Sequence, residues 1–174
     1  MEMEKGLRLC GVEIKSYRSS CFIDGAEQER IISAGAAPDC GCFMRGGFED
    51  DEILFEICSA DRGRCARLWE QFAGAAGRYG GAAGRTWSVE GFHDPVDDLS
   101  ALGEELVQAL GGRLRQINNH PRMVQLLADL PWGGVGILLD QGPVNLALEL
   151  SEDTYLHKVK VRLGIPVLFS LSNG

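Results

Sequence analysis

The chain has 174 residues, of which 45% are hydrophobic and 24% are charged, so it can bury a core and lacks the composition of a disordered protein. Lysine and arginine number 17 and aspartate and glutamate 25, which gives a formal net charge of −8. This charge disfavours nucleic acid and anionic membrane surfaces as partners, because both bind proteins largely through cations.

The sequence predicts a chain that is not embedded in a membrane. No segment approaches the roughly 20 apolar residues of a membrane-spanning helix, and the first residues lack the apolar stretch of a signal peptide. As written, the chain is expected in the cytoplasm. A mature chain whose leader had been removed would look the same, so an extracytoplasmic location stays open.

Residues 1–84 predict a first α/β half. Alternating apolar residues predict strands at 6–24 and 51–61. An apolar period of three to four residues predicts a helix at 63–81, in which Trp69 belongs to the core. The glycine- and alanine-rich end of that segment resembles a linker to the rest of the chain.

Residues 85–174 predict a second half of the same kind. The helix at 97–111 is the clearest element of the chain, since leucines form one stripe and Asp97 or Asp98 can cap its first turn. A strand is expected before this helix, and alternating strands continue after it to residue 170. We therefore expect an α+β protein built of two similar α/β halves.

The segment at 120–131 leaves two interpretations open. Its apolar residues at 123, 127 and 130 fit the spacing of a helix, whereas a strand would require them to alternate. Periodicity alone favours the helix.

The second half also carries a family resemblance. The stretches "TWSVEGF", "RMVQLLADLPW", "GPVNLALEL" and "HKVKVRLGIPVLF", with the leucine helix after the first, are similar to the C-terminal half of the YwmB family over residues 86–169. The resemblance implies a fold like that of the TATA-box-binding protein, in which two α/β halves share one curved antiparallel sheet. It also implies that 120–131 is a strand.

The same resemblance has implications for biology. It implies a spore-forming bacterial source and export across the membrane, and it implies no established enzyme activity. DNA binding is not carried over with the fold, because the chain is acidic and has no basic stripe.

Six cysteines lie in the first 65 residues and none follow. Cys40 and Cys42 are two residues apart, and with Cys58 and Cys65 they are candidates for a metal site or a disulfide. Structural zinc sites more often use paired Cys-x(2–4)-Cys knuckles, and the second knuckle is missing. The sequence selects no disulfide pairing, and buried free thiols are the third interpretation.

Candidate binding residues lie in the second half: Trp87, Trp132, Asn145 and His157. The tryptophans can frame a ligand-binding face. Asn145 opens the Asn-Leu strand of the family resemblance. His157 is expected on a strand, on the same face as Val159, where it would be partly buried.

No spacing in the chain predicts catalysis. The dipeptide His93-Asp94 looks like half of a catalytic pair, but its position before Pro95 predicts a turn. The acidic runs at 50–52 and 152–153 lack the oxygen spacing of a calcium loop. We therefore expect no catalytic residue and no cofactor.

Two functions are consistent with these observations. The first is a non-enzymatic binding or assembly module with a protein or peptide partner, placed by the family resemblance in the bacterial cell envelope or in sporulation. The alternative is a small metal-binding or redox protein centred on the cysteines.

Overall fold

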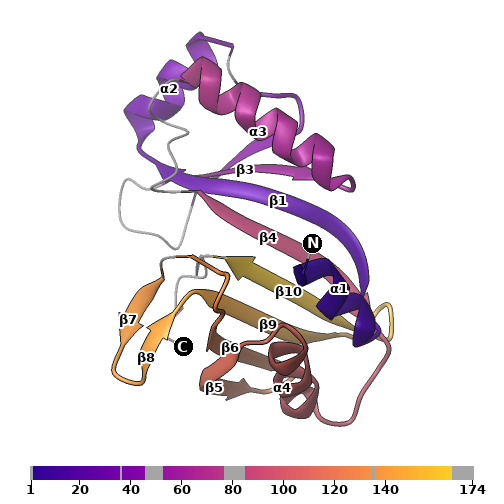
Figure 1. The fold of residues 1–174 in the computed structure, drawn as a ribbon. Helices are drawn as coiled ribbons and strands as arrows, with labels where there is room; N and C mark the ends of the chain where they lie inside the picture. The colour runs from indigo at the N-terminus through magenta and orange to yellow at the C-terminus, as the bar shows by residue number, and fades with distance from the viewer. Residues whose placement is uncertain (1, 36, 46–52, 77–84, 135, 166–174) are drawn as a thin grey trace. The chain divides into compact units, whose positions relative to one another are not determined.

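The structure is a computed structural model, and it describes residues 2–35, 37–45, 53–76, 85–134 and 136–165 (Figure 1). The chain divides into two compact units: unit 1 is Met1–Lys15 with Ser88–Gly174, and unit 2 is Ser16–Trp87. The predicted division between residues 84 and 85 differs from this, because the first 15 residues belong with the second half of the chain.

The described residues form an α+β protein in which four helices accompany antiparallel strands. The elements are α1 (Glu2–Leu9), β1 (Glu13–Ile23), α2 (Gly25–Ser33), β2 (Gly41–Arg45), β3 (Ile53–Ser59), α3 (Arg62–Ala76), β4 (Thr86–His93), α4 (Leu99–Ala109), β5 (Arg113–His120), β6 (Met123–Asp129), β7 (Ile137–Leu139), β8 (Gly142–Val144), β9 (Leu146–Asp153) and β10 (Lys158–Ile165).

In unit 2, the strands lie in the order β2-β3-β1, and both pairs are antiparallel. Helix α3 packs against β3 through aromatic side chains. The ring of Phe55 lies 4.3 Å from that of Phe72 and 6.5 Å from that of Trp69, measured between centroids. Trp69 is 2% exposed, so its predicted place in the core is confirmed.

In unit 1, the strand order is β4-β10-β9-β6-β5, and α4 packs on this sheet (Figure 1). The predicted helix at 97–111 is confirmed as α4, and the Asp98 carboxylate accepts a hydrogen bond from the Ala101 amide at 3.0 Å. Gly103 allows a close approach to β6, because a Cβ there would lie 2.4 Å from Leu126 Cδ1. Strands β7 and β8 form a separate hairpin.

The helical interpretation of 120–131 is wrong, since the chain forms β6 there. Leu126, Leu127 and Ala128 are consecutive and fully buried. A strand with one buried face would bury every second residue, so this run lacks the alternation of apolar and polar residues that identifies such a strand. The cause is that both faces of β6 are covered. Leu126 meets α4, while Leu127 packs in a cluster with Val144 of the β7–β8 hairpin.

The strand predicted at 6–24 begins later, at Glu13, because the preceding residues form α1. This helix packs against α4 within unit 1. Gly6 makes the approach possible, since a Cβ at this position would lie 2.9 Å from Leu110 Cδ2. Strand β5 is a further element that the apolar pattern did not reveal, because its side chains are largely polar. The predicted run of strands to residue 170 is described only as far as Ile165.

The Asn145 side chain joins the ends of β6 and β9 within unit 1. Its Oδ1 accepts a hydrogen bond from the Leu130 amide at 2.7 Å, and its Nδ2 donates to the carbonyl oxygens of Leu130 at 2.8 Å and Gly134 at 3.0 Å. The carboxamide therefore donates and accepts hydrogen bonds as a peptide group does. It extends the hydrogen bonding between the two strands beyond their last paired residues, Ala128 and Leu146.

Replacing Asn145 with alanine leaves the buried amide and carbonyl of Leu130 without these partners. We expect Asn145→Ala to lower the free energy of unfolding by about 2–4 kcal/mol, measured by urea denaturation. Asn119→Ala is the matched control, because Asn119 is exposed, and it should change stability by less than about 0.5 kcal/mol. Equal effects of the two substitutions would contradict this role for Asn145.

Candidate functional site

The strongest candidate site is a group of aromatic and arginine side chains in unit 2, which we call the arginine–tryptophan cluster. Three elements supply it: β1, helix α3, and β4 with the residue before it. Its members are Tyr17, Arg62, Trp69, Arg85 and Trp87.

The guanidinium of Arg85 lies between two indole rings. Its Cζ is 5.2 Å from the ring centroid of Trp69 and 5.7 Å from that of Trp87. Its Nη2 donates a hydrogen bond to Ser19 Oγ at 3.1 Å, whereas its Nε is buried and has no hydrogen-bond partner in the described part of the chain. These contacts hold a positive charge in a partly desolvated position.

Burial of the Arg85 guanidinium lowers its pKa, because desolvation disfavours the charged form. The nearby groups Cys65 and Glu70 oppose this change. Arginine remains protonated at neutral pH even after such a shift. The cluster therefore keeps a cation in a position with reduced access to water.

Trp87 carries a second guanidinium on the same ring. The Cζ of Arg62, the first residue of α3, lies 6.0 Å from the Trp87 centroid. Tyr17 stacks on Trp87 with centroids 6.0 Å apart and an angle of 29° between the ring planes. Trp87 is half-buried and Arg62 is exposed, so the cluster extends from the core of unit 2 to its surface.

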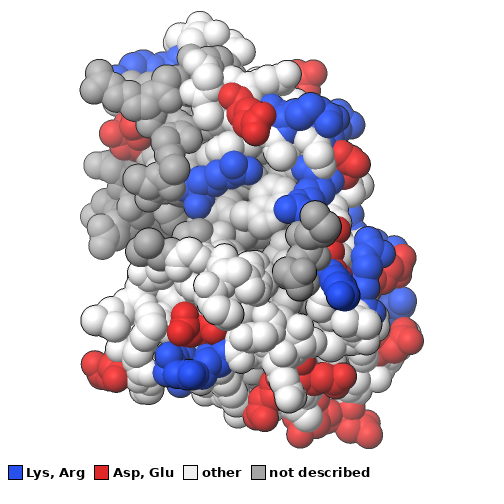
Figure 2. All heavy atoms as spheres, viewed as in Figure 1, with Lys and Arg blue, Asp and Glu red and all other residues white. Residues whose placement is uncertain are grey.

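The surface of unit 2 agrees with this arrangement. Figure 2 shows basic side chains on both sides of an area of uncharged atoms, over the region of α3 and β1. Each cation–π contact contributes about 0.5–2 kcal/mol, depending on how far the cation is desolvated. Chemically, the cluster can bind a group that combines negative charge with apolar surface.

The sequence prediction included Trp87 but missed Arg62, Arg85 and Tyr17. One signal was available for Arg85. It lies two residues before Trp87, so the two side chains share a face if the strand extends through both. No local pattern connects Tyr17 or Arg62 to Trp87, because they come from distant parts of the chain.

The other predicted tryptophan lies in unit 1, in the turn after β6. Trp132 is 41% exposed, and its indole Nε1 donates a hydrogen bond to the Leu110 carbonyl oxygen at 3.1 Å. Asn145 is buried, and its side-chain oxygen and nitrogen are bonded to backbone groups. Asn145 is therefore a structural residue of unit 1, whereas Trp87 belongs to unit 2.

His157 is not on a strand, so this part of the sequence prediction is wrong. The Asp153 carboxylate accepts hydrogen bonds from the amides of Tyr155 at 3.0 Å and Leu156 at 2.8 Å, and these bonds form a turn between β9 and β10. His157 ends that turn in a left-handed conformation with φ of 50°, and it is exposed.

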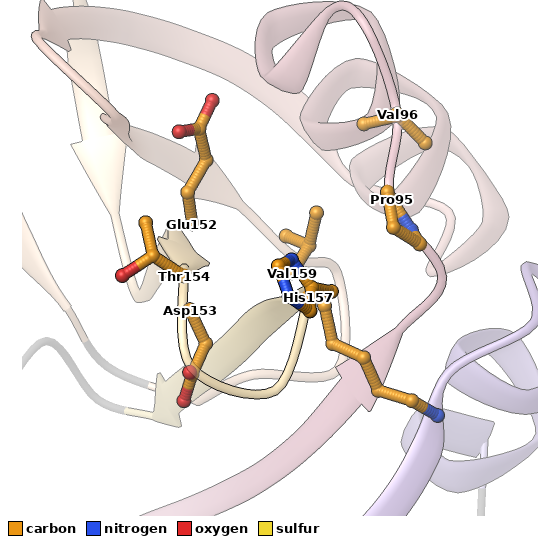
Figure 3. Close-up of a pocket in the computed structure, with 8 residues that line it drawn as sticks. Pro95, Val96, Glu152, Asp153, Thr154, His157 and Val159 are labelled. Atoms are coloured by element: carbon orange, nitrogen blue, oxygen red, sulfur yellow. The ribbon is translucent and has the colours of Figure 1, made fainter.

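His157 lines a shallow pocket of about 190 Å³ in unit 1 (Figure 3). Pro95 and Val96, which precede α4, form one side, and the β9–β10 turn forms the other. The carboxylates of Glu152 and Asp153 point in opposite directions (Figure 3), so they do not converge on a common ligand. The pocket has no arrangement that favours a particular chemistry.

His93 also has a structural role. Its Nδ1 lies 2.6 Å from the backbone oxygen of Asp94, and the Asp94 carboxylate instead forms an ion pair with Lys158 at 3.8 Å. The two residues therefore form no catalytic pair. The acidic run at 50–52 lies outside the described residues.

The four candidate cysteines belong to unit 2, and all are free thiols: Cys40, Cys42, Cys58 and Cys65. Cys42 lies opposite Glu56, and Cys58 follows two residues later on β3, so Cys42 and Cys58 are diagonal neighbours. Diagonal positions are about 7–8 Å apart, which is too far for a disulfide without movement of the backbone. Within the described ranges, no three His, Cys, Asp or Glu side chains are grouped to hold a metal ion.

The local environment of Cys42 and Cys65 makes these two thiols weak nucleophiles. Burial raises the pKa of the Cys42 thiol, and the Glu56 carboxylate adds to the effect. Burial also raises the pKa of Cys65, and it raises that of Cys21 to about 11. A higher pKa lowers the fraction of thiolate, which is the reactive form.

Two comparisons of the sequence with known proteins find no match. No protein-family model matches it, and no curated protein matches it. Among the described residues, no helix has the length and hydropathy needed to cross a membrane.

The thiols should differ in reactivity towards iodoacetamide. In the folded protein we expect Cys42 to be alkylated first, because it is exposed, and Cys21 and Cys65 to be protected, because they are buried. The Cys42 rate should continue to rise as the pH passes the ordinary thiol pKa, since its own pKa is higher. Peptide mass analysis measures each site, and denatured protein, in which all six thiols react, is the control. Labelling of Cys65 as fast as Cys42 would contradict the structure.

Proposed function

We propose that the chain is a non-enzymatic binding module, whose unit 2 recognises a protein or peptide partner on the arginine–tryptophan cluster. The observation that carries the proposal is that two guanidinium groups lie within 6.0 Å of the centroid of one half-buried indole. Tryptophan, tyrosine and arginine are the residue types that contribute most energy at the centres of protein interfaces.

Part of the cluster has a structural role. Arg85 and Trp69 fill the space beside α3, and their contact stabilises unit 2. Arg62 is different, because it is exposed at the start of α3 and its long side chain loses conformational freedom where it approaches Trp87. The exposed side of the cluster is therefore the part that supports binding.

The family resemblance remains a proposal about ancestry and location. Its support is the position of β6, β9 and β10, which occupy the segments where the resemblance implies strands. On this proposal the two units correspond to the α/β halves of a fold like that of the TATA-box-binding protein, and the protein acts outside the cytoplasm of a spore-forming bacterium.

The cysteine-centred alternative is supported by the proximity of the thiols. Cys42 and Cys58 are diagonal neighbours on β2 and β3, and Cys58 and Cys40 lie close enough to Cys65 to affect its pKa. The raised pKa of Cys42 disfavours a reactive thiolate there. The arginine–tryptophan cluster is therefore the better candidate.

The proposal is tested by selecting binders from a random peptide library displayed on phage. We expect peptides that bind the wild-type chain and lose at least about tenfold in affinity for Trp87→Ala, which corresponds to about 1.4 kcal/mol. Trp132→Ala is the matched control, since Trp132 is a partly exposed tryptophan of unit 1, and it should retain binding.

Two results would reject this function. One is that no peptide is selected. The other is that the selected peptides bind Trp87→Ala and the wild type equally well, while circular dichroism shows that both proteins are folded.

A further inference from the structure

We infer that the arginine–tryptophan cluster recognises a carboxylate of an acidic peptide segment, with apolar side chains of the same segment lying on Trp87. This inference rests on the proposed function, and it specifies the chemistry of the partner. Three observations lead to it: the lack of a counter-charge for Arg85 among the described residues, the second cation near the same ring, and the acidic remainder of the chain.

Among the described residues Arg85 has no carboxylate partner, whereas two other partly buried arginines have one. Arg18 forms an ion pair with Glu56 at 2.8 Å, and Arg115 forms one with Asp129 at 3.3 Å. In the part of the chain that the structure describes, no carboxylate lies within ion-pair distance of Arg85, although Glu70 exerts a longer-range effect.

A partly desolvated cation without a counter-charge is costly, because burial removes water without replacing it. The cost appears at Arg85 as a pKa that burial lowers. A carboxylate brought by a partner would supply a counter-charge at the fork of the guanidinium.

Arg62 adds a second cation near the same ring. Its guanidinium and that of Arg85 lie 6.0 and 5.7 Å from the Trp87 centroid. Both cations therefore lie near one apolar ring. An acidic side chain can approach the guanidiniums while a neighbouring apolar side chain contacts the indole.

The net negative charge of the chain disfavours the binding of longer polyanions. The sequence has 25 acidic and 17 basic residues, so an extended chain of phosphates would meet repulsion beyond the cluster. An anionic membrane surface would meet the same repulsion over a wider area. A short peptide with one or a few carboxylates fits within the local positive region.

The experiment measures the affinity of the full chain for two synthetic peptides with blocked ends, by isothermal titration calorimetry. One peptide alternates glutamate with leucine and phenylalanine, and the other has glutamine at each glutamate position. We expect the glutamate peptide to bind at least about tenfold more tightly, with a preference that falls as salt is raised.

Variants of the two arginines locate the effect. Arg62→Gln and Arg85→Gln should each abolish most of the preference for the glutamate peptide. Arg113→Gln is the control, because Arg113 is an exposed arginine of β5 in unit 1 and should leave the preference unchanged. Arg62→Gln keeps the test decisive if Arg85→Gln does not fold, since Arg62 is exposed.

The outcomes separate this inference from the proposed function. Binding that depends on Trp87 but does not distinguish the two peptides would overturn the carboxylate inference and leave the binding module intact. Absence of Trp87-dependent binding to any peptide would overturn both. Tighter Arg62-dependent binding to a single-stranded oligonucleotide, or to vesicles containing anionic lipid, would overturn the choice of an acidic peptide.

Discussion

The position of the Arg85 guanidinium between two indole rings is the constraint on which the candidate site depends. A cation in this position gains from both aromatic faces, at 5.2 and 5.7 Å, and it loses water that would otherwise solvate it. The contacts hold the side chain in place, and no carboxylate of the described residues neutralises its charge. We infer anion recognition from this fixed cation next to apolar surface.

The core of unit 2 supplies the rigidity that this position requires. Trp69 is anchored by Phe72 and Phe55, with ring centroids 5.4 and 6.5 Å away, and all three rings are buried. Helix α3 therefore presents one wall of the Arg85 site from a packed interior. The other wall, Trp87, is supported by Tyr17 of β1. Strand β1 and helix α3 come from distant parts of the sequence. Both lie beside β3, because β1 pairs with it and α3 packs against it.

The sequence predicted the elements with strong local signals and missed those that depend on tertiary contacts. The stripe of leucines and Asp98 were sufficient for α4, and alternation was sufficient for β3. Periodicity failed at β6, where α4 covers one face and the β7–β8 hairpin the other. Tertiary contacts also limited the prediction of the site. Trp87 was predicted because a tryptophan is a candidate binding residue by its type alone. Arg62 could not be predicted, because its importance depends on its contact with the Trp87 ring.

Recognition at the arginine–tryptophan cluster can be tested in the indole region of a proton–nitrogen NMR spectrum, recorded while the glutamate peptide is added to the full chain. We expect the Trp87 indole signal to shift in a saturable manner. The Trp132 signal should stay unchanged, since its indole donates to the Leu110 carbonyl in unit 1. A shift of Trp132 without one of Trp87, or no indole shift at peptide concentrations that saturate binding, would contradict recognition at the arginine–tryptophan cluster.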